Sequence, residues 1–69
     1  MAQNNLEPMN VQFRNWRLDR GITQPQLAKM IGIGRTSYVH FEQFGIGGAR
    51  IMTKIKVFYS EHIAKEENK

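Results

Sequence analysis

The side chains that most often perform catalysis or bind metals are few in this chain and far apart. The histidines His40 and His62 are distant from each other, lack a third ligand at useful spacing, and have only Glu61 as a close carboxylate. The absence of cysteine removes disulfides, thiolate zinc sites and cysteine nucleophiles. The six acids are scattered, and no spacing suggests a grouping of Ser, His and Asp or Glu. We expect no enzyme, metal site, cofactor or small-molecule substrate.

One short segment has the composition of a phosphate-binding loop. Residues 32–37 read Gly-Ile-Gly-Arg-Thr-Ser, but they lack the lysine and the spacing of a Walker motif, and no strand precedes them. A tight turn between two helices explains these glycines better.

Charge is the stronger chemical signal. The net charge is +4, and residues 11–60 hold eight Lys or Arg against only Asp19 and Glu42. The two ends of the chain are mildly acidic. A basic body of this kind favours a polyanionic partner such as nucleic acid, and an ordinary solvated surface is the alternative interpretation.

Apolar periodicity predicts the elements that position these charges. Leu6, Met9, Phe13 and Trp16 form one helical stripe, so a helix is expected over residues 6–20, ending at Gly21. Of these, Phe13 and Trp16 are expected in the core rather than stacked on bases.

A second helix is predicted from Thr23, which forms a capping box with Gln26 and is followed by Pro25 in the first turn. Leu27, Met30 and Ile31 are expected on its inner side, and Gly32 ends it. A third helix then begins near Arg35 and directs Tyr38 and Phe41 inward. Its other side is left with residues of varied chemistry, namely Arg35, Thr36, Val39, His40 and Gln43.

Residues 44–48 hold three of the six glycines and are expected to form a loop. A fourth helix follows, with apolar residues spaced for burial at Ile51, Ile55, Phe58, Tyr59 and one turn further at Ile63. The fold class is therefore all-α, a compact bundle of four to five helices. We expect a single domain over residues 1–69, with residues 1–5 loose and residues 65–69 frayed.

No apolar run reaches the length of a signal peptide core or a membrane span. A cytoplasmic protein without membrane contact is therefore expected.

Two short helices joined by three residues, with the small Ala28 where the second crosses the first, form a specific pattern. The pattern resembles the lambda-repressor-like, Cro/XRE-type helix-turn-helix family over residues 11–60, and it places the helix-turn-helix at residues 23–43. The residues that carry the resemblance are Gln24-x-x-Leu27-Ala28-x-x-Ile31-Gly32-Ile33-x-Arg35-x-x-Tyr38-x-x-Phe41-Glu42.

The resemblance implies roles by position. Arg17 and Glu42 would form a structural ion pair. Base edges would be contacted by Arg35, Thr36, Val39 and His40. Phosphates would be contacted by Gln24, Gln43, Arg50 and Lys54.

This chain departs from the family pattern at three places. Gly34 stands where the third helix usually has a Ser or Thr cap, and Phe44 stands where a glycine often ends that helix. No glycine break follows Tyr59, so one long helix is expected to replace the family's usual end.

The resemblance implies a sequence-specific transcriptional regulator, most simply a small repressor of phage or mobile-element type. It would bind a palindromic operator as a homodimer, at least on DNA, with Tyr59, Ile63 and the glycine loop as the candidate interface. The alternative is a protein-interaction module on the same scaffold, a repressor antagonist or antitoxin-like protein, which the apolar residues Val39 and Ile46 favour.

Overall fold

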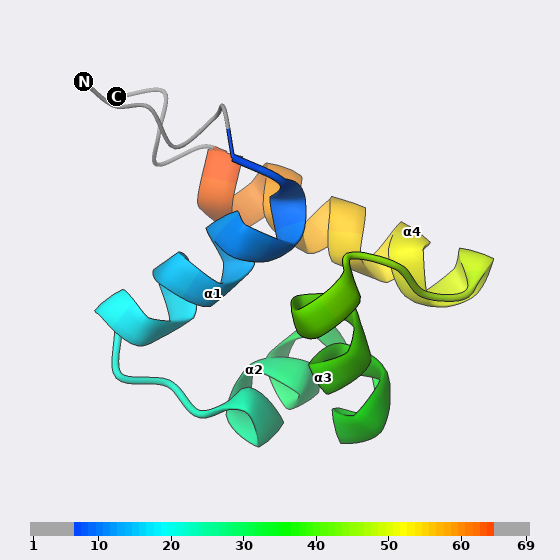
Figure 1. Ribbon diagram of the computed structural model, residues 1–69, viewed down its shortest axis with the longest axis horizontal. Coiled ribbons are helices and arrows are strands. Elements are labelled where there is room, and N and C mark those ends of the chain that lie inside the picture. Colours follow the sequence, from blue (N-terminus) through cyan, green and yellow to red (C-terminus); the bar gives the residue numbers. More distant parts are fainter. Residues whose placement is uncertain (1–6, 65–69) are drawn as a thin grey trace.

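Helices make up nearly all of the computed structural model, which describes residues 7–64 (Figure 1). No strand occurs within this range, so the chain belongs to the all-α class. The expectations for residues 1–5 and 65–69, and for Leu6, lie outside the described residues. The elements are α1 (Met9–Asp19), α2 (Gln24–Ile31), α3 (Arg35–Phe44), α4 (Ala49–Phe58) and a π-helical turn (Tyr59–Ile63).

Helix α1 begins directly after Pro8 and ends in a left-handed glycine. Gly21 has a φ of 67°, and its amide donates to the Leu18 carbonyl while the Ile22 amide donates to the Arg17 carbonyl. These two bonds form a Schellman motif, which satisfies carbonyls that the helix end would otherwise leave open. The predicted end of the first helix is therefore confirmed. Its predicted start at residue 6 is wrong, because Glu7 and Pro8 are not helical and α1 begins at Met9.

Helix α2 begins with the predicted capping box. The Gln26 amide donates to Thr23 Oγ1 at 3.2 Å, and the Thr23 amide donates to Gln26 Oε1 at 2.8 Å. The helix ends at Gly32, whose φ is 94°. Both ends are therefore set by local chemistry, as the sequence indicates.

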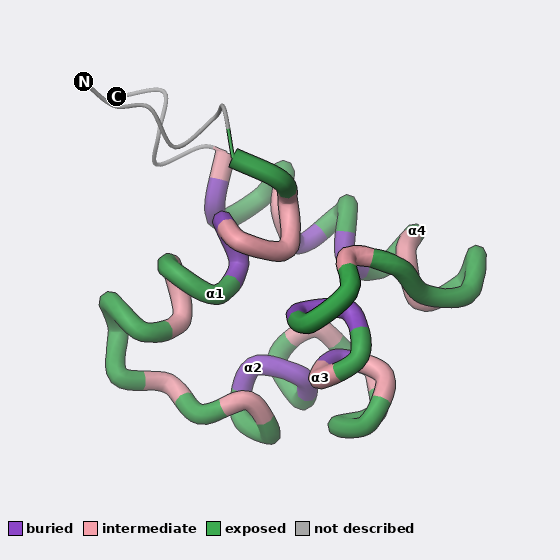
Figure 2. Tube along the Cα trace, in the orientation of Figure 1, coloured by how far each residue is buried: buried purple, intermediate pink, exposed green. Residues whose placement is uncertain are grey.

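The prediction for the inner side of α2 is wrong at Met30. This side chain is 51% exposed, whereas Leu27 and Ala28 are buried. Spacing of three or four residues places Met30 and Ile31 equally well beside Leu27, but only Ile31 packs against the core. Figure 2 shows the buried part of α2 turned toward the centre of the molecule.

Helix α3 extends through Phe44, and Gly45 ends it with a φ of 79°. The expectation of a loop over residues 44–48 is therefore wrong at Phe44, which is the last residue of α3 because the left-handed glycine comes one residue later. Its N-cap Gly34 makes no side-chain cap bond. Tyr38, Phe41 and Glu42 form the buried side.

Helix α4 continues without a break into the π-helical turn, as the absence of a glycine after Tyr59 suggests. The Tyr59 hydroxyl donates to Gln12 Oε1 at 2.8 Å, which ties the π-helical turn to α1. Ile63 is only 2% exposed and belongs to the core. The burial that spacing predicts for Ile63 is therefore confirmed. Ile63 offers almost no surface to a second copy, and the dimer interface around Tyr59 and the glycine loop stays a prediction.

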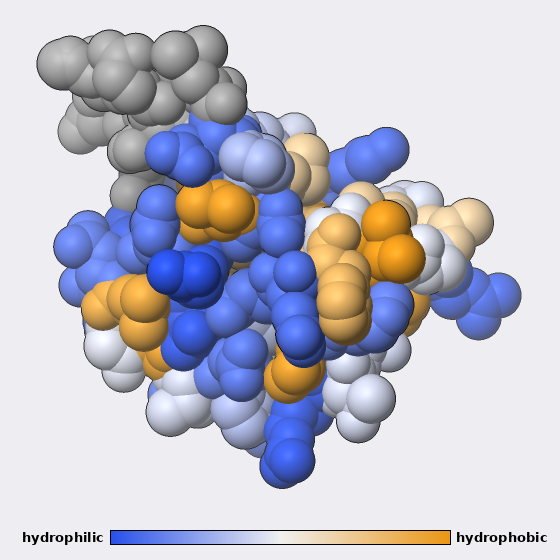
Figure 3. Space-filling model, viewed as in Figure 1, coloured by the Kyte–Doolittle hydropathy of each residue, from blue (hydrophilic) through white to orange (hydrophobic). Residues whose placement is uncertain are grey.

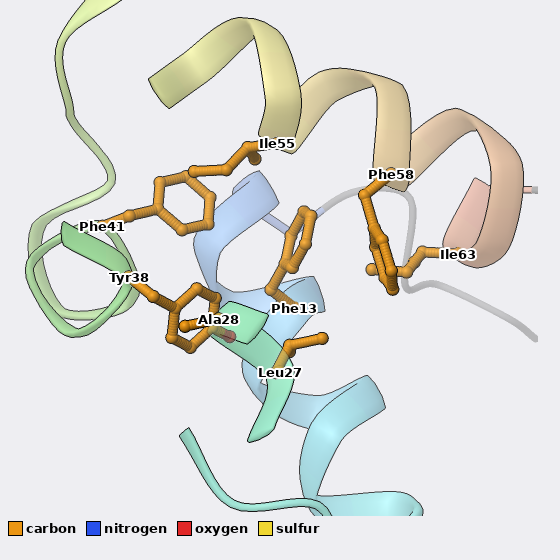
Figure 4. Packing of buried hydrophobic residues seen from close by; sticks show 8 residues of the cluster. All are labelled: Phe13, Leu27, Ala28, Tyr38, Phe41, Ile55, Phe58 and Ile63. Carbon is orange, nitrogen blue, oxygen red and sulfur yellow. The ribbon is translucent and has the colours of Figure 1, made fainter. Parts of the chain in front are cut away.

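The core is centred on the ring of Phe13. It packs edge-on against Phe41, with ring centroids 5.3 Å apart, and contacts Tyr38, Phe58 and Tyr59 at 6.1–6.4 Å. Figure 4 shows Phe13 of α1 between side chains from α3 and α4. Trp16 lies at the edge of this core, edge-on to Phe58, with the Arg20 guanidinium over its ring.

Within residues 7–64, no helix combines the length and the apolar composition that a membrane crossing needs.

Candidate nucleic-acid interface

An ion pair with little exposure to solvent joins α1 to α3. Arg17 Nε donates to Glu42 Oε2 at 2.9 Å, and Arg17 Nη2 donates to Glu42 Oε1 at 3.0 Å. The Arg17 and Glu42 side chains are 13% and 5% exposed. The third nitrogen, Nη1, donates to the Ile22 carbonyl at 3.0 Å. This two-bond arrangement fixes the direction of both side chains as well as neutralising their charges.

Two further donors complete the environment of Glu42. The Tyr38 hydroxyl donates to Oε2 at 2.5 Å, and Gln24 Nε2 donates to Oε1 at 3.0 Å. The carboxylate is thus held by side chains from α1, α2 and α3 together. The sequence pattern marks Arg17 and Glu42, but it does not reveal Tyr38 as their partner, although Tyr38 lies one helical turn before Glu42.

This network shifts the titration of all three ionisable members. Burial alone would raise the pKa of Glu42, but the hydrogen bonds from Arg17, Tyr38 and Gln24 outweigh it and lower the pKa. The hydrogen bond to Glu42 raises the pKa of Arg17. Burial, together with the bond to Glu42, raises the pKa of Tyr38. At neutral pH the network therefore holds one carboxylate, one guanidinium and one neutral phenol.

The network also holds a side chain that the resemblance assigns to phosphate contact. Gln24 is half-buried, and its amide group bridges α2 to Glu42. An amide nitrogen carries two hydrogens, so one N–H of Gln24 remains for another acceptor. The structure thus gives Gln24 a structural bond, and its phosphate contact stays a prediction.

The outward side of α3 presents the four candidate base-contacting residues and Gln43, a candidate for phosphate contact. Arg35, Thr36, His40 and Gln43 are exposed, while Val39 is half-buried. Their spacing of one, three or four residues places them on the side opposite Tyr38 and Phe41. The structure therefore brings these five side chains to one helix face, of which Val39 offers the least surface.

An aromatic side chain that sequence reasoning left without a role extends this face. Phe44, the last residue of α3, is 58% exposed, and its ring centroid is 4.9 Å from that of His40. The spacing of four residues between them is the sequence signal that could have indicated this contact.

The end of α3 is fixed against α1. Asn10 Nδ2 donates to the carbonyl of Glu42 at 3.0 Å. The same side chain lies against Gly45, where an added Cβ would meet Asn10 Oδ1 at 3.3 Å. Asn10 was not among the sequence-predicted residues, because its partner lies 32 positions away.

The two basic candidates on α4 occupy different places. Arg50 is exposed in the first turn of α4. Lys54 Nζ instead donates to the Gly32 carbonyl at 3.2 Å, so it lies beside the turn between α2 and α3. A shallow groove runs between α3 and the start of α4, lined by Thr36, Ser37, His40, Ile46, Gly47, Gly48 and Ile51.

Among the described residues, no three His, Asp or Glu side chains lie close enough to hold a metal ion. Comparisons with protein-family models, with curated proteins and with solved structures find no match to this chain.

Proposed function

We propose that this chain is a sequence-specific double-stranded DNA-binding regulator, a small repressor in which α2 and α3 act as a lambda-repressor-like helix-turn-helix. The observation that carries the proposal is the outward face of α3. Arg35, Thr36 and His40 are exposed on one side of a helix whose other side is held through Glu42. Base reading needs such a combination, since varied donors and acceptors must be presented on a rigid support.

The dimensions and chemistry of α3 suit the major groove of B-DNA. A helix of 10 residues is about 15 Å long, and the major groove is roughly 12 Å wide and admits an α-helix. Arg35 would donate two hydrogen bonds to guanine, and His40 would donate to a purine N7. Thr36 and the exposed part of Val39 would contact thymine methyl groups.

Basic and polar side chains around α3 would contact the phosphates. Gln43 at the end of α3 and Arg50 at the start of α4 lie on either side of the glycine loop. Lys54 would contribute from beside the α2–α3 turn. The free N–H of Gln24 would contribute from the start of α2, next to Glu42. These contacts set the position of a protein on the duplex and do not depend on base sequence.

One copy of such a unit covers only half of a typical operator. We therefore propose a homodimer on a palindromic site, with half-site centres about one helical turn of DNA apart. Sedimentation of the chain with a duplex carrying one or two half-sites would measure how many copies bind. Binding of a single copy to the full site would contradict the proposed dimer.

The proposal is tested by selecting bound sites from random duplex DNA and measuring affinity for the selected duplex at several salt concentrations. We expect an enriched palindrome, and a logarithm of affinity that falls with log salt by about 0.9 per phosphate contacted. Binding without sequence enrichment, or a salt-independent affinity, would contradict the proposed function.

Arg35→Ala belongs in the same measurement. This variant should lose about 1–3 kcal/mol of binding free energy on the selected site and should discriminate less between bases at one base pair. Arg14→Ala, which removes an exposed arginine of α1, is the matched control and should retain that preference. An equal effect of both variants on every duplex would show that Arg35 reads no base.

The second candidate function is a protein-interaction module, either a repressor antagonist or an antitoxin-like protein. The exposed apolar side chains Phe44 and Ile46 favour it, because large exposed apolar groups often mark protein contacts. Stable binding of one specific protein without measurable duplex binding would select this function over the first.

A further inference from the structure

Two large apolar side chains stand exposed where α3 ends and the glycine loop begins. Phe44 is 58% exposed and Ile46 is 59% exposed. In Figure 3 apolar side chains gather over the connection between α3 and α4, on a face that is otherwise mainly hydrophilic. This apolar area borders the face of Arg35, Thr36 and His40 that we assign to base reading.

The position of Phe44 is defined by the packing around it. The Gly45 amide donates to the Phe41 carbonyl at 2.7 Å, and Asn10 holds the carbonyl of Glu42. The end of α3 is therefore tied to α1 and is not a loose helix terminus. Phe44 lies one turn beyond His40, about 6 Å along the helix axis.

The rings of His40 and Phe44 pack against each other. Their centroids are 4.9 Å apart at an interplanar angle of 51°. This contact restricts the orientation of His40, which the proposed function uses as a hydrogen-bond donor. Phe44 is therefore part of the same outward surface as His40.

A phenyl ring has no hydrogen-bonding group, so its exposed part can gain free energy on DNA only through apolar contact. In the major groove, the 5-methyl group of thymine is the apolar feature that distinguishes one base from the others, and phenylalanine is among the side chains that contact it. We propose that Phe44 is a specificity-determining residue that contacts a thymine methyl group next to the base read by His40. This inference rests on the proposed function.

A protein partner fits these side chains less well. A stable protein interface buries about 800 Å² on each partner, and Phe44 and Ile46 are only two side chains beside an exposed polar face made by Thr36, His40 and Gln43. The basic balance of residues 11–60 also favours a polyanion over an apolar protein surface.

The test uses the full chain and the duplex selected from random DNA, with each thymine replaced in turn by deoxyuridine. This replacement removes one methyl group and leaves base pairing unchanged. For the unmodified chain we expect one replacement next to the His40 base pair to weaken binding about fourfold, which corresponds to burial of one methyl-sized group. Phe44→Ala should bind the selected duplex more weakly and lose the sensitivity at that position.

Two variants serve as controls. Leu18→Ala removes a side chain of similar exposure, 56%, from the end of α1 and should retain the full deoxyuridine pattern. Phe44→Leu keeps an apolar side chain and should retain part of the effect. Thermal unfolding of each variant verifies that the fold is intact, as expected for half-exposed positions.

Three outcomes would overturn the inference while leaving the proposed function in place. The first is a selected site that has no thymine next to the His40 base pair. The second is that every deoxyuridine replacement changes the affinity of the unmodified chain equally. The third is that Phe44→Ala loses as much affinity as the unmodified chain on replacement at that position. Loss of self-association in Phe44→Ala, with the deoxyuridine pattern retained, would overturn it in favour of contact between two copies. Failure of the unmodified chain to enrich any duplex would instead contradict the proposed function itself.

Discussion

At the scale of single residues, Glu42 has the strongest influence on the site, because its carboxylate binds side chains from three helices. The pKa of Glu42 is lower in the folded chain than its ordinary value near 4.3. Between these two pKa values the unfolded chain binds more protons than the folded chain, so the free energy of unfolding decreases as the pH falls through this range. We expect urea unfolding to show a loss of stability as the pH falls below about 5. Glu42→Gln should lower the free energy of unfolding by roughly 3 kcal/mol at neutral pH, because Arg17 loses its counter-ion. It should also weaken the dependence of stability on pH below about 5. Glu61→Gln, at an exposed site, is the control and should change neither the stability at neutral pH nor its dependence on pH.

At the scale of elements, the turn between α2 and α3 depends on two glycines with opposite requirements. Gly32 has a φ of 94°, where only glycine is unstrained, whereas Gly34 has a φ of −71° and open space around it. Gly32→Ala should destabilise the fold by about 1–2 kcal/mol through backbone strain. Gly34→Ser should stabilise it by about 0.5 kcal/mol, since serine supplies the missing cap of α3. Thermal unfolding measures both, and shifts of the same sign would contradict this account of the turn.

At the scale of the whole molecule, stability depends on a core in which Phe13 contacts rings from α3, α4 and the π-helical turn. Phe13→Ala should cost about 3–5 kcal/mol, and a domain of this size has only about 3–10 kcal/mol in total. The variant should therefore be largely unfolded at 37 °C by circular dichroism. Leu18→Ala, at a 56% exposed site, should change stability by less than about 0.5 kcal/mol. A well-folded Phe13→Ala would show that the core is held elsewhere.

Local sequence was sufficient for the start of α2 and for the glycines that end α1 and α2, but not for the start of α1 or the last residue of α3. The capping box of Thr23 and Gln26 starts α2, and left-handed glycines follow α1, α2 and α3. The physical reason is that capping bonds and positive φ angles involve residues within a few positions of each other. The periodicity of apolar residues likewise indicated the all-α class and the burial of Phe13, Tyr38 and Phe41.

Only the tertiary structure decided which of the apolar residues on each helix are buried by neighbouring helices. On α2, Met30 is exposed whereas Ala28 is buried in the core, a difference that spacing along the helix does not contain. The bond of Gln24 to Glu42 and the bond of Asn10 to the end of α3 join residues 18 and 32 positions apart. The π-helical turn at Tyr59–Ile63 was likewise not indicated by the sequence. Hydrogen-bond partners and covered faces follow from how helices cross, and crossing is a property of the packed molecule.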